Sequence, residues 1–143
     1  LPIHVVVTGL QALDGYATVR AALPDAVRAE AIGHRLYNDR RSTADAVIET
    51  VFLRLYMLRM GLLRARPAAA DRLAIHGFIE ALRATEAGLH VLASELFDQR
   101  SGAVPAQPCR GLFLCAPDDA GGAFVEDMFE RFLPADQPLA RAA

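Results

Sequence analysis

Two short apolar runs near opposite ends of the chain are typical of buried strands. Residues 3–8 read IHVVVT and residues 110–115 read RGLFLC. Strands that are apolar on both faces belong in parallel sheets that are covered on both sides. Each run is followed by turn residues and then by a helix-like pattern, as parallel connections require. We therefore expect these two strands to be adjacent and parallel, with about a hundred residues between them.

Between these runs the apolar residues change to helical spacing, which predicts a helical insertion over about residues 17–99. Its strongest helix is expected from Ser42 to Arg66, because Ser42 followed three residues later by Asp45 resembles a capping box. The apolar residues that repeat on one side of this helix are Val47, Val51, Leu55, Leu58 and Leu62.

The same helix carries a second set of apolar residues. Phe52, Tyr56 and Leu63 widen its apolar arc to about 180°, whereas a core-facing stripe usually covers about 100°. A chain with two strands and a few helices has little mass to cover both sides. We therefore expect these three side chains to stay exposed and to form an interface with a partner, since sizeable apolar patches mark contacts. The alternative is a helix that its own chain buries on both sides.

Gly, Pro and Asp residues divide the rest of the chain. The remaining expected elements are helices at about 17–22, 25–32, 68–77 and 78–98, with Gly33 and Gly77 as C-terminal stops, a polar connection at 34–41, a loop at 100–108, a turn at 116–122, a C-terminal helix at about 122–133 and a tail at 134–143.

The predicted order is strand, several helices, strand and helix, which indicates an α/β fold that is mostly helical. Two strands do not make a stable sheet alone, and the chain begins with Leu1 rather than Met. We therefore expect residues 1–143 to be a single partial domain. It would be a fragment of a three-layer domain, with two short parallel strands and a helical insertion between them.

Composition excludes several classes of protein. Apolar residues make up 53% of the chain, which disfavours disorder, and the net charge of −2 gives no electrostatic case for nucleic acid. All 15 basic residues are Arg, so this chain holds no P-loop lysine and no Schiff-base lysine. The longest apolar stretch, residues 46–63, contains Glu49, Arg54 and Arg59, and we interpret it as a buried helix rather than a membrane span.

Neither the cysteines nor the histidines are spaced like a metal site, so we expect no bound metal. Cys109 and Cys115 fall on one predicted strand, about 20 Å apart at about 3.3 Å per residue, which predicts free thiols. The histidines share no ligand spacing, and they are His4, His34, His76 and His90. The DDAGG turn at 118–122 is a weak candidate for an anion site, and an ordinary turn is the better interpretation.

The loop after the first strand is the most informative candidate site. Ligands of parallel sheets bind at the carboxyl ends of the strands, where this chain has Thr8-Gly9-Leu10-Gln11. GTPase-type domains carry Asn- or Thr-Lys-x-Asp at such a position, and the Asp accepts hydrogen bonds from guanine. Here Gly9 replaces the lysine and Gln11 the carboxylate, which removes the charge-assisted pairing. Thr8, Gly9 and Gln11 therefore predict a degenerate base-binding loop without a cofactor.

Five stretches, in order, resemble the IcmF/TssM family, the large inner-membrane component of type VI secretion systems. They are LPIHVVVTGLQALDGY at 1–16, LPDAVRAEAIGH at 23–34, DRLAIHGFIEALRATEAGLHVLASELFDQ at 71–99, CRGLFLCAPDD at 109–119 and FVEDMFERFLPADQPLA at 124–140. The chain departs from the family pattern at Ile79, where the family has proline, and at Cys115-Ala116, where it has Thr-Ser.

The resemblance implies that the chain is the C-terminal part of a cytoplasmic, GTPase-like NTPase domain. Its two strands would then be neighbours in the sheet, a P-loop would precede residue 1, and a transmembrane helix would follow the tail. The parent would be anchored in the bacterial inner membrane, with this soluble segment on the cytoplasmic face. The implied partners are the other membrane-complex, lipoprotein and baseplate components. The departures at Gly9 and Gln11 weaken the implied nucleotide binding.

These observations favour a structural and interaction segment of a type VI secretion protein that is not catalytic on its own. The alternative is the C-terminal half of an NTP-binding and hydrolysing domain whose P-loop lies outside this chain. A third interpretation is a soluble helical module from another pathway.

Overall fold

Three short strands form a mixed sheet whose central strand is the last one in the sequence. The computed structural model describes residues 3–36, 43–97, 109–117 and 123–141. The strands are β1 (Ile3–Val7), β2 (Ile32–Arg35) and β3 (Cys109–Leu114), in the order β1-β3-β2. β1 pairs with β3 in parallel, which confirms the predicted adjacency of the two apolar runs, and β2 pairs with β3 in the antiparallel sense.

β2 was not expected, because it spans the predicted end of a helix at Ile32 and Gly33 and the start of the predicted polar connection at 34–41. The predicted helix at 25–32 is too long, since α2 (Asp25–Ala29) ends at Ala29 and β2 begins at Ile32. Gly33 is not a helix stop but the point of closest approach to β3. A Cβ atom on Gly33 would lie 2.4 Å from Cδ1 of Phe113. A glycine inside a strand often marks such an approach, so Gly33 belongs to a strand and the predicted helix stop there is wrong.

The helices largely follow the predicted pattern. Their bounds are α1 (Tyr16–Ala22), α3 (Ala44–Ala65), α4 (Ala69–Arg83) and α5 (Glu86–Phe97). The long helix, α3, is confirmed within two residues at each end. Its N-terminus is capped by Thr43, whose side chain accepts a hydrogen bond from the backbone N–H of Ala46 at 3.2 Å. Ser42, the predicted cap, lies outside the described residues.

Gly77 does not end a helix, which corrects the predicted boundary there. α4 continues through it because Ile75, Phe78 and Leu82, on either side of the glycine, form one buried stripe. The break comes instead at Ala84 and Thr85, where the Thr85 hydroxyl donates to the carbonyl of Leu82 at 2.7 Å. Packing of a continuous stripe therefore outweighed the local helix propensity of one glycine.

The C-terminal helix extends further than predicted. A π-helical segment, Met128–Phe132, leads into α6 (Leu133–Arg141), which includes Pro138. The expected helix at 122–133 thus covers only the first part of the helical region, and the predicted tail is mostly helix. The predicted turn at 118–122 and loop at 100–108 lie outside the described residues.

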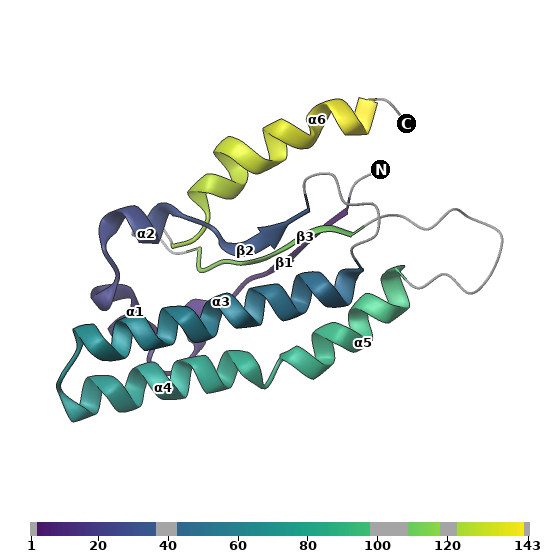
Figure 1. Cartoon of the computed structure of the whole chain (residues 1–143). Helices are drawn as coiled ribbons and strands as arrows, with labels where there is room; N and C mark the ends of the chain where they lie inside the picture. Colours follow the sequence, from purple (N-terminus) through teal and green to yellow (C-terminus); the bar gives the residue numbers. More distant parts are fainter. Residues whose placement is uncertain (1–2, 37–42, 98–108, 118–122, 142–143) are drawn as a thin grey trace.

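The elements stack in layers, with α3 on one face of the sheet and α6 on the other (Figure 1). α4 and α5 pack on the far side of α3. The main core lies between α3 and the sheet, where Val47 and Val51 are fully buried alongside Leu112 and Leu114 of β3. In the described ranges, no helix is both long and apolar enough to cross a bilayer.

Candidate functional sites

The loop after β1 lies where the sequence placed it, at the carboxyl end of a strand with a parallel neighbour. Gly9 has a φ of 92°, a left-handed conformation that favours glycine. A short 3-10 turn, Leu10–Ala12, follows, and Leu10 is buried in the core. The side chains of Thr8 and Gln11 are exposed. The loop therefore presents a hydroxyl and an amide to solvent, and Leu10 anchors it.

The core-facing stripe of α3 is confirmed, because Val47, Val51, Leu55 and Leu62 are buried, but the second apolar set is not exposed as predicted. Phe52 is only 3% exposed and belongs to the core, so the expectation that it stays exposed is wrong. Tyr56 and Leu63 are half-buried. α4 packs against α3, with Arg59 of α3 paired to Glu80 of α4 at 2.9 Å, so the chain itself covers more of α3 than was expected.

The exposed apolar side chains of α3 are instead Leu53, Met57 and Met60. Their exposed fractions are 60%, 67% and 50%. They recur at spacings of four and three residues, so they lie on one face of the helix, bordered by Tyr56 and Leu63. This row was not predicted, because periodicity identified the core-facing stripe but α3 is apolar around so much of its circumference that the exposed set was assigned to Phe52, Tyr56 and Leu63 instead.

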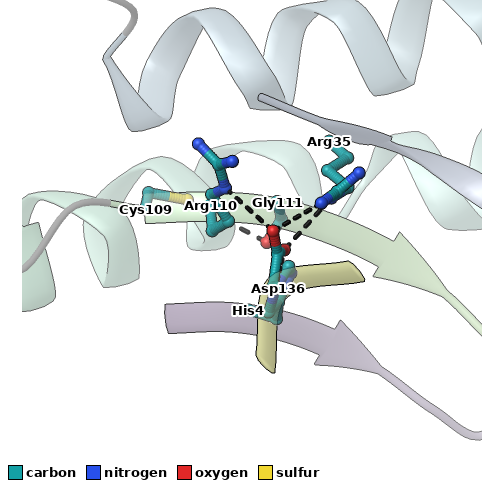
Figure 2. A network of polar contacts seen from close by, with 6 residues as sticks. All are labelled: His4, Arg35, Cys109, Arg110, Gly111 and Asp136. Carbon is teal, nitrogen blue, oxygen red and sulfur yellow. Dashed lines mark hydrogen bonds and ion pairs between the residues drawn. The ribbon is translucent and has the colours of Figure 1, made fainter. Parts of the chain in front are cut away.

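A polar network, in which one carboxylate meets all three strands, lies on the opposite face of the sheet (Figure 2). Asp136 of α6 is 4% exposed and is the only buried polar or charged residue in the described part of the chain. Its Oδ2 lies 2.9 Å from His4 Nε2 and 3.0 Å from Arg35 Nε. Its Oδ1 accepts a hydrogen bond from Arg35 Nη2 and lies 3.4 Å from Arg110 Nε. Each strand thus supplies one side chain to the carboxylate.

Strand register explains why these side chains converge. His4 of β1 and Arg35 of β2 are both paired with Gly111 of β3, so they flank the same glycine. Between Ile3 and His4 the register shifts by one residue, which leaves Arg110 as an extra residue in β3. Such bulges re-aim a side chain, and here the Arg110 guanidinium reaches the same carboxylate as His4.

Burial is the largest single influence on Asp136 and raises the pKa of its carboxyl. The hydrogen bonds and charge of Arg35 lower that pKa, and Arg110 and His4 add to the lowering. The net pKa is below the usual value, so Asp136 is ionised. Charge-assisted hydrogen bonds of this kind are the strong ones.

His4 is neutral in this network. Burial is the largest influence and lowers the pKa of His4, the charge and hydrogen bond of Asp136 raise it, and Arg35 and Arg110 lower it, so that the pKa lies below its usual value. Because a carboxylate only accepts hydrogen bonds, we assign the tautomer in which Nε2–H donates to Asp136. Nδ1 is then an unprotonated nitrogen, and it is buried without a hydrogen-bond partner.

Aromatic side chains cover the network. The ring of Phe113 lies 5.6 Å from that of Phe132, nearly stacked, and 5.7 Å from the imidazole of His4. The guanidinium carbon of Arg35 lies 5.9 Å from the centre of the Phe132 ring. This cover lowers the local dielectric, which strengthens the charged hydrogen bonds beneath it.

Sequence analysis missed the network because Asp136 is separated from its partners by up to 132 residues. The one available signal was a histidine within a run of valines and isoleucine. A polar residue at a single position of an apolar strand indicates that one face of that strand meets a polar group.

The two cysteines are free thiols, as predicted. Both Cys109 and Cys115 are free, and burial raises the pKa of each thiol. Cys115 donates to the carbonyl of Phe124 at 3.3 Å. Within the described residues, no group of three or more His, Cys, Asp or Glu side chains is placed to hold a metal ion.

Comparison with known families gives one result. A family model described as the IcmF-related N-terminal domain matches residues 1–121. The match supports the family resemblance and corrects the placement within it, because the matched region is the family's N-terminal domain rather than a C-terminal NTPase part. Neither a curated protein nor a solved structure matches the chain.

Proposed function

Because the chain belongs to the IcmF-related family, we propose that it is a structural and interaction segment of a type VI secretion membrane-complex protein, without catalysis of its own. The partners would be other membrane-complex and baseplate components. The parent would be membrane-anchored, and this segment would lie on the cytoplasmic face of the bacterial inner membrane. Family membership supports the association with secretion, and the surface of α3 supports the interaction role.

The row of Leu53, Met57 and Met60 carries the proposal. Three large apolar side chains, each at least half exposed, extend over seven residues, or about 10 Å of helix. Methionine adapts to irregular partner surfaces and is common at binding faces. Half-buried Tyr56 and Leu63 border the row and enlarge the apolar surface beyond it. A surface of this kind fits an apolar helix or strand of a partner protein.

The test is Met57→Glu in the full-length parent. A charge at the centre of the row would be desolvated on partner binding, and a penalty of about 1.4 kcal/mol or more weakens binding at least about tenfold. We expect co-purification with the secretion complex and secretion itself to fall, while the thermal unfolding of this chain stays unchanged. The control is Leu73→Glu on α4, which is 72% exposed and outside the row. Wild-type secretion by the Met57→Glu parent would contradict the proposal.

A second candidate is part of an NTP-binding domain whose P-loop lies outside this chain. The parallel pairing of β1 with β3, with the Thr8-Gly9 loop at its carboxyl end, favours it. Against it stand Gly9 in place of the base-reading lysine and the amide of Gln11 in place of a carboxylate. We expect calorimetric titration of the chain with GTP or ATP to show no dissociation constant below about 100 μM. Tighter binding would favour the NTP-binding role.

A further inference from the structure

α6 is held to the sheet through a charged side chain rather than an apolar stripe. Of its described side chains, Leu133 to Pro138, only that of Asp136 is buried, and the other five are exposed. A helix that packs on a sheet normally buries an apolar face. Here the apolar contacts come from the preceding π-helical segment, through Met128 and Phe132. Among the described side chains of α6, one carboxylate therefore makes the contact with the sheet.

The groups that hold the carboxylate all belong to the sheet. Four N–H groups meet its two oxygens: His4 Nε2 and Arg35 Nε at Oδ2, and Arg35 Nη2 and Arg110 Nε at Oδ1. Arg35 presents two parallel N–H bonds to two oxygens of one plane, which is the bidentate geometry that matches carboxylates. Backbone pairing of β1, β2 and β3 positions all three side chains around Gly111.

Gly111 of β3 is the residue that pairs with both His4 and Arg35. A Cβ atom on Gly111 would lie 2.8 Å from the carbonyl oxygen of His34 and 3.0 Å from the ring of Phe113. Through this pairing, the backbone of β3 runs between His4 and Arg35. A set of converging donors on a paired sheet, with the aromatic side chains of Phe113 and Phe132 beside it, has the features of a binding site and not only of a helix contact.

We infer that His4, Arg35 and Arg110 form a carboxylate-binding site, which Asp136 occupies as a built-in ligand and which an acidic side chain of a partner protein takes when α6 is displaced. α6 would then compete with the partner for the site. A π-helical segment adjoins α6, and such segments recur at functional sites. The inference does not depend on the apolar row of α3, which lies on the other side of the sheet.

Chemical rescue tests the site. In Asp136→Ala the donors lose their ligand, and we expect sodium acetate to stabilise the variant more than sodium chloride does at equal ionic strength. A dissociation constant of about 10 mM would raise the folding equilibrium constant about 11-fold at 100 mM acetate. The wild type, whose site is filled, should respond equally to the two salts. In NMR spectra, acetate should shift the imidazole signals of His4 in the variant but not those of His34.

A peptide of residues 126–141 tests occupancy by an acidic segment. Added to Asp136→Ala, the peptide should shift the His4 signals, whereas the same peptide with Asp136→Asn should not. If Asp136→Ala does not fold, the wild-type peptide is added to the wild-type chain, and amide exchange in α6 should then rise with peptide concentration. The inference is overturned if acetate stabilises Asp136→Ala no more than chloride does, or if phosphate binds to this variant more tightly than acetate. It is also overturned if neither Asp136→Ala nor the wild-type chain responds to the peptide.

Discussion

The two faces of the sheet make different kinds of contact: one packs into an apolar core, and the other meets a charged side chain. On the α3 face, Val5 and Val7 of β1 and Leu112 of β3 pack into the large apolar core. On the α6 face, the alternate residue His4 meets Asp136, and the alternate residue Phe113 stacks on Phe132. Because successive side chains of a strand point to opposite faces, strands of five or six residues such as β1 and β3 contribute to both the apolar and the charged contacts.

The difference separates the face that stabilises the fold from the face that controls the attachment of α6. Apolar burial grows with the area removed from water, is not directional, and does not depend on pH. A buried polar network stabilises only while every member is present, because a single missing partner leaves a desolvated charge behind. We therefore expect the α3 face to determine whether the chain folds, and the α6 face to determine whether α6 is attached.

The largest effect is expected from Leu55→Ala in α3. Leu55 is 2% exposed, and truncation of a buried leucine costs about 2–5 kcal/mol of unfolding free energy through lost burial and a cavity. Urea unfolding followed by circular dichroism measures it. Leu53→Ala makes the same substitution two residues away at an exposed position, and should change stability by less than about 0.5 kcal/mol. Equal losses for the two variants would contradict the assignment of the α3 face.

A smaller and local effect is expected from Asp136→Asn. The carboxamide has one acceptor oxygen and places N–H groups against the donors of Arg35 or Arg110, so α6 should detach at a cost of about 1–3 kcal/mol. Hydrogen exchange measured by mass spectrometry should show faster exchange in α6 and unchanged protection in α3.

Asp127→Asn is the matched control for that substitution. Asp127 pairs with Arg131 at 3.0 Å, one turn along the helix, and an exposed pair of this kind contributes less than about 1 kcal/mol. Retention of wild-type protection in α6 of the Asp136 variant would show that the apolar contacts of Phe132 suffice to hold the helix.

The smallest effect is a pH dependence confined to the α6 face. The pKa of His4 is lowered by burial, so the unfolded chain takes up a proton as the pH falls through about 6.5 while the folded chain resists it. Stability should therefore fall on acidification, with a ceiling of about 1.4 kcal/mol per pH unit for one group. Asp136, whose pKa is also lowered, adds a further loss below its ordinary pKa of 3.8.

His4→Gln isolates the contribution of His4 to the pH dependence of stability, because glutamine keeps an N–H donor and does not titrate. Urea unfolding at pH 7.5 and 5.5 should show a smaller loss for this variant than for the wild type. His34, whose pKa is lowered by burial and by Arg54, contributes with the same sign, so His34→Gln is measured alongside. An unchanged pH dependence in His4→Gln would contradict the assignment of the network as the acid-sensitive face.

Sequence predicted the α3 face far better than the α6 face. The strand pairing and α3 follow from apolar runs and helical periodicity, which are local patterns. The boundaries at Gly33 and Gly77 were wrong because a glycine is compatible with a helix end, a close approach or a helix interior, and only tertiary packing selects among them. Asp136 carries no local signal, since its surroundings contain two prolines and alanines and its partners lie on three strands. The loop that begins at Thr8 follows β1 as predicted, because the end of an apolar strand is itself a local signal.

The central position of β3 constrains the order in which the chain acquires its structure during synthesis. β1 and β2 are not neighbours in the described sheet, so within this sheet each of them waits for β3, which leaves the ribosome more than seventy residues after β2. At ordinary elongation rates that delay is roughly 4–15 s for β2. Meanwhile the hairpin of α3 and α4 can form from contacts near in sequence, and such contacts form fastest. The apolar residues of β1 remain uncovered during this interval, which makes the nascent chain a candidate for chaperone binding before its last strand arrives.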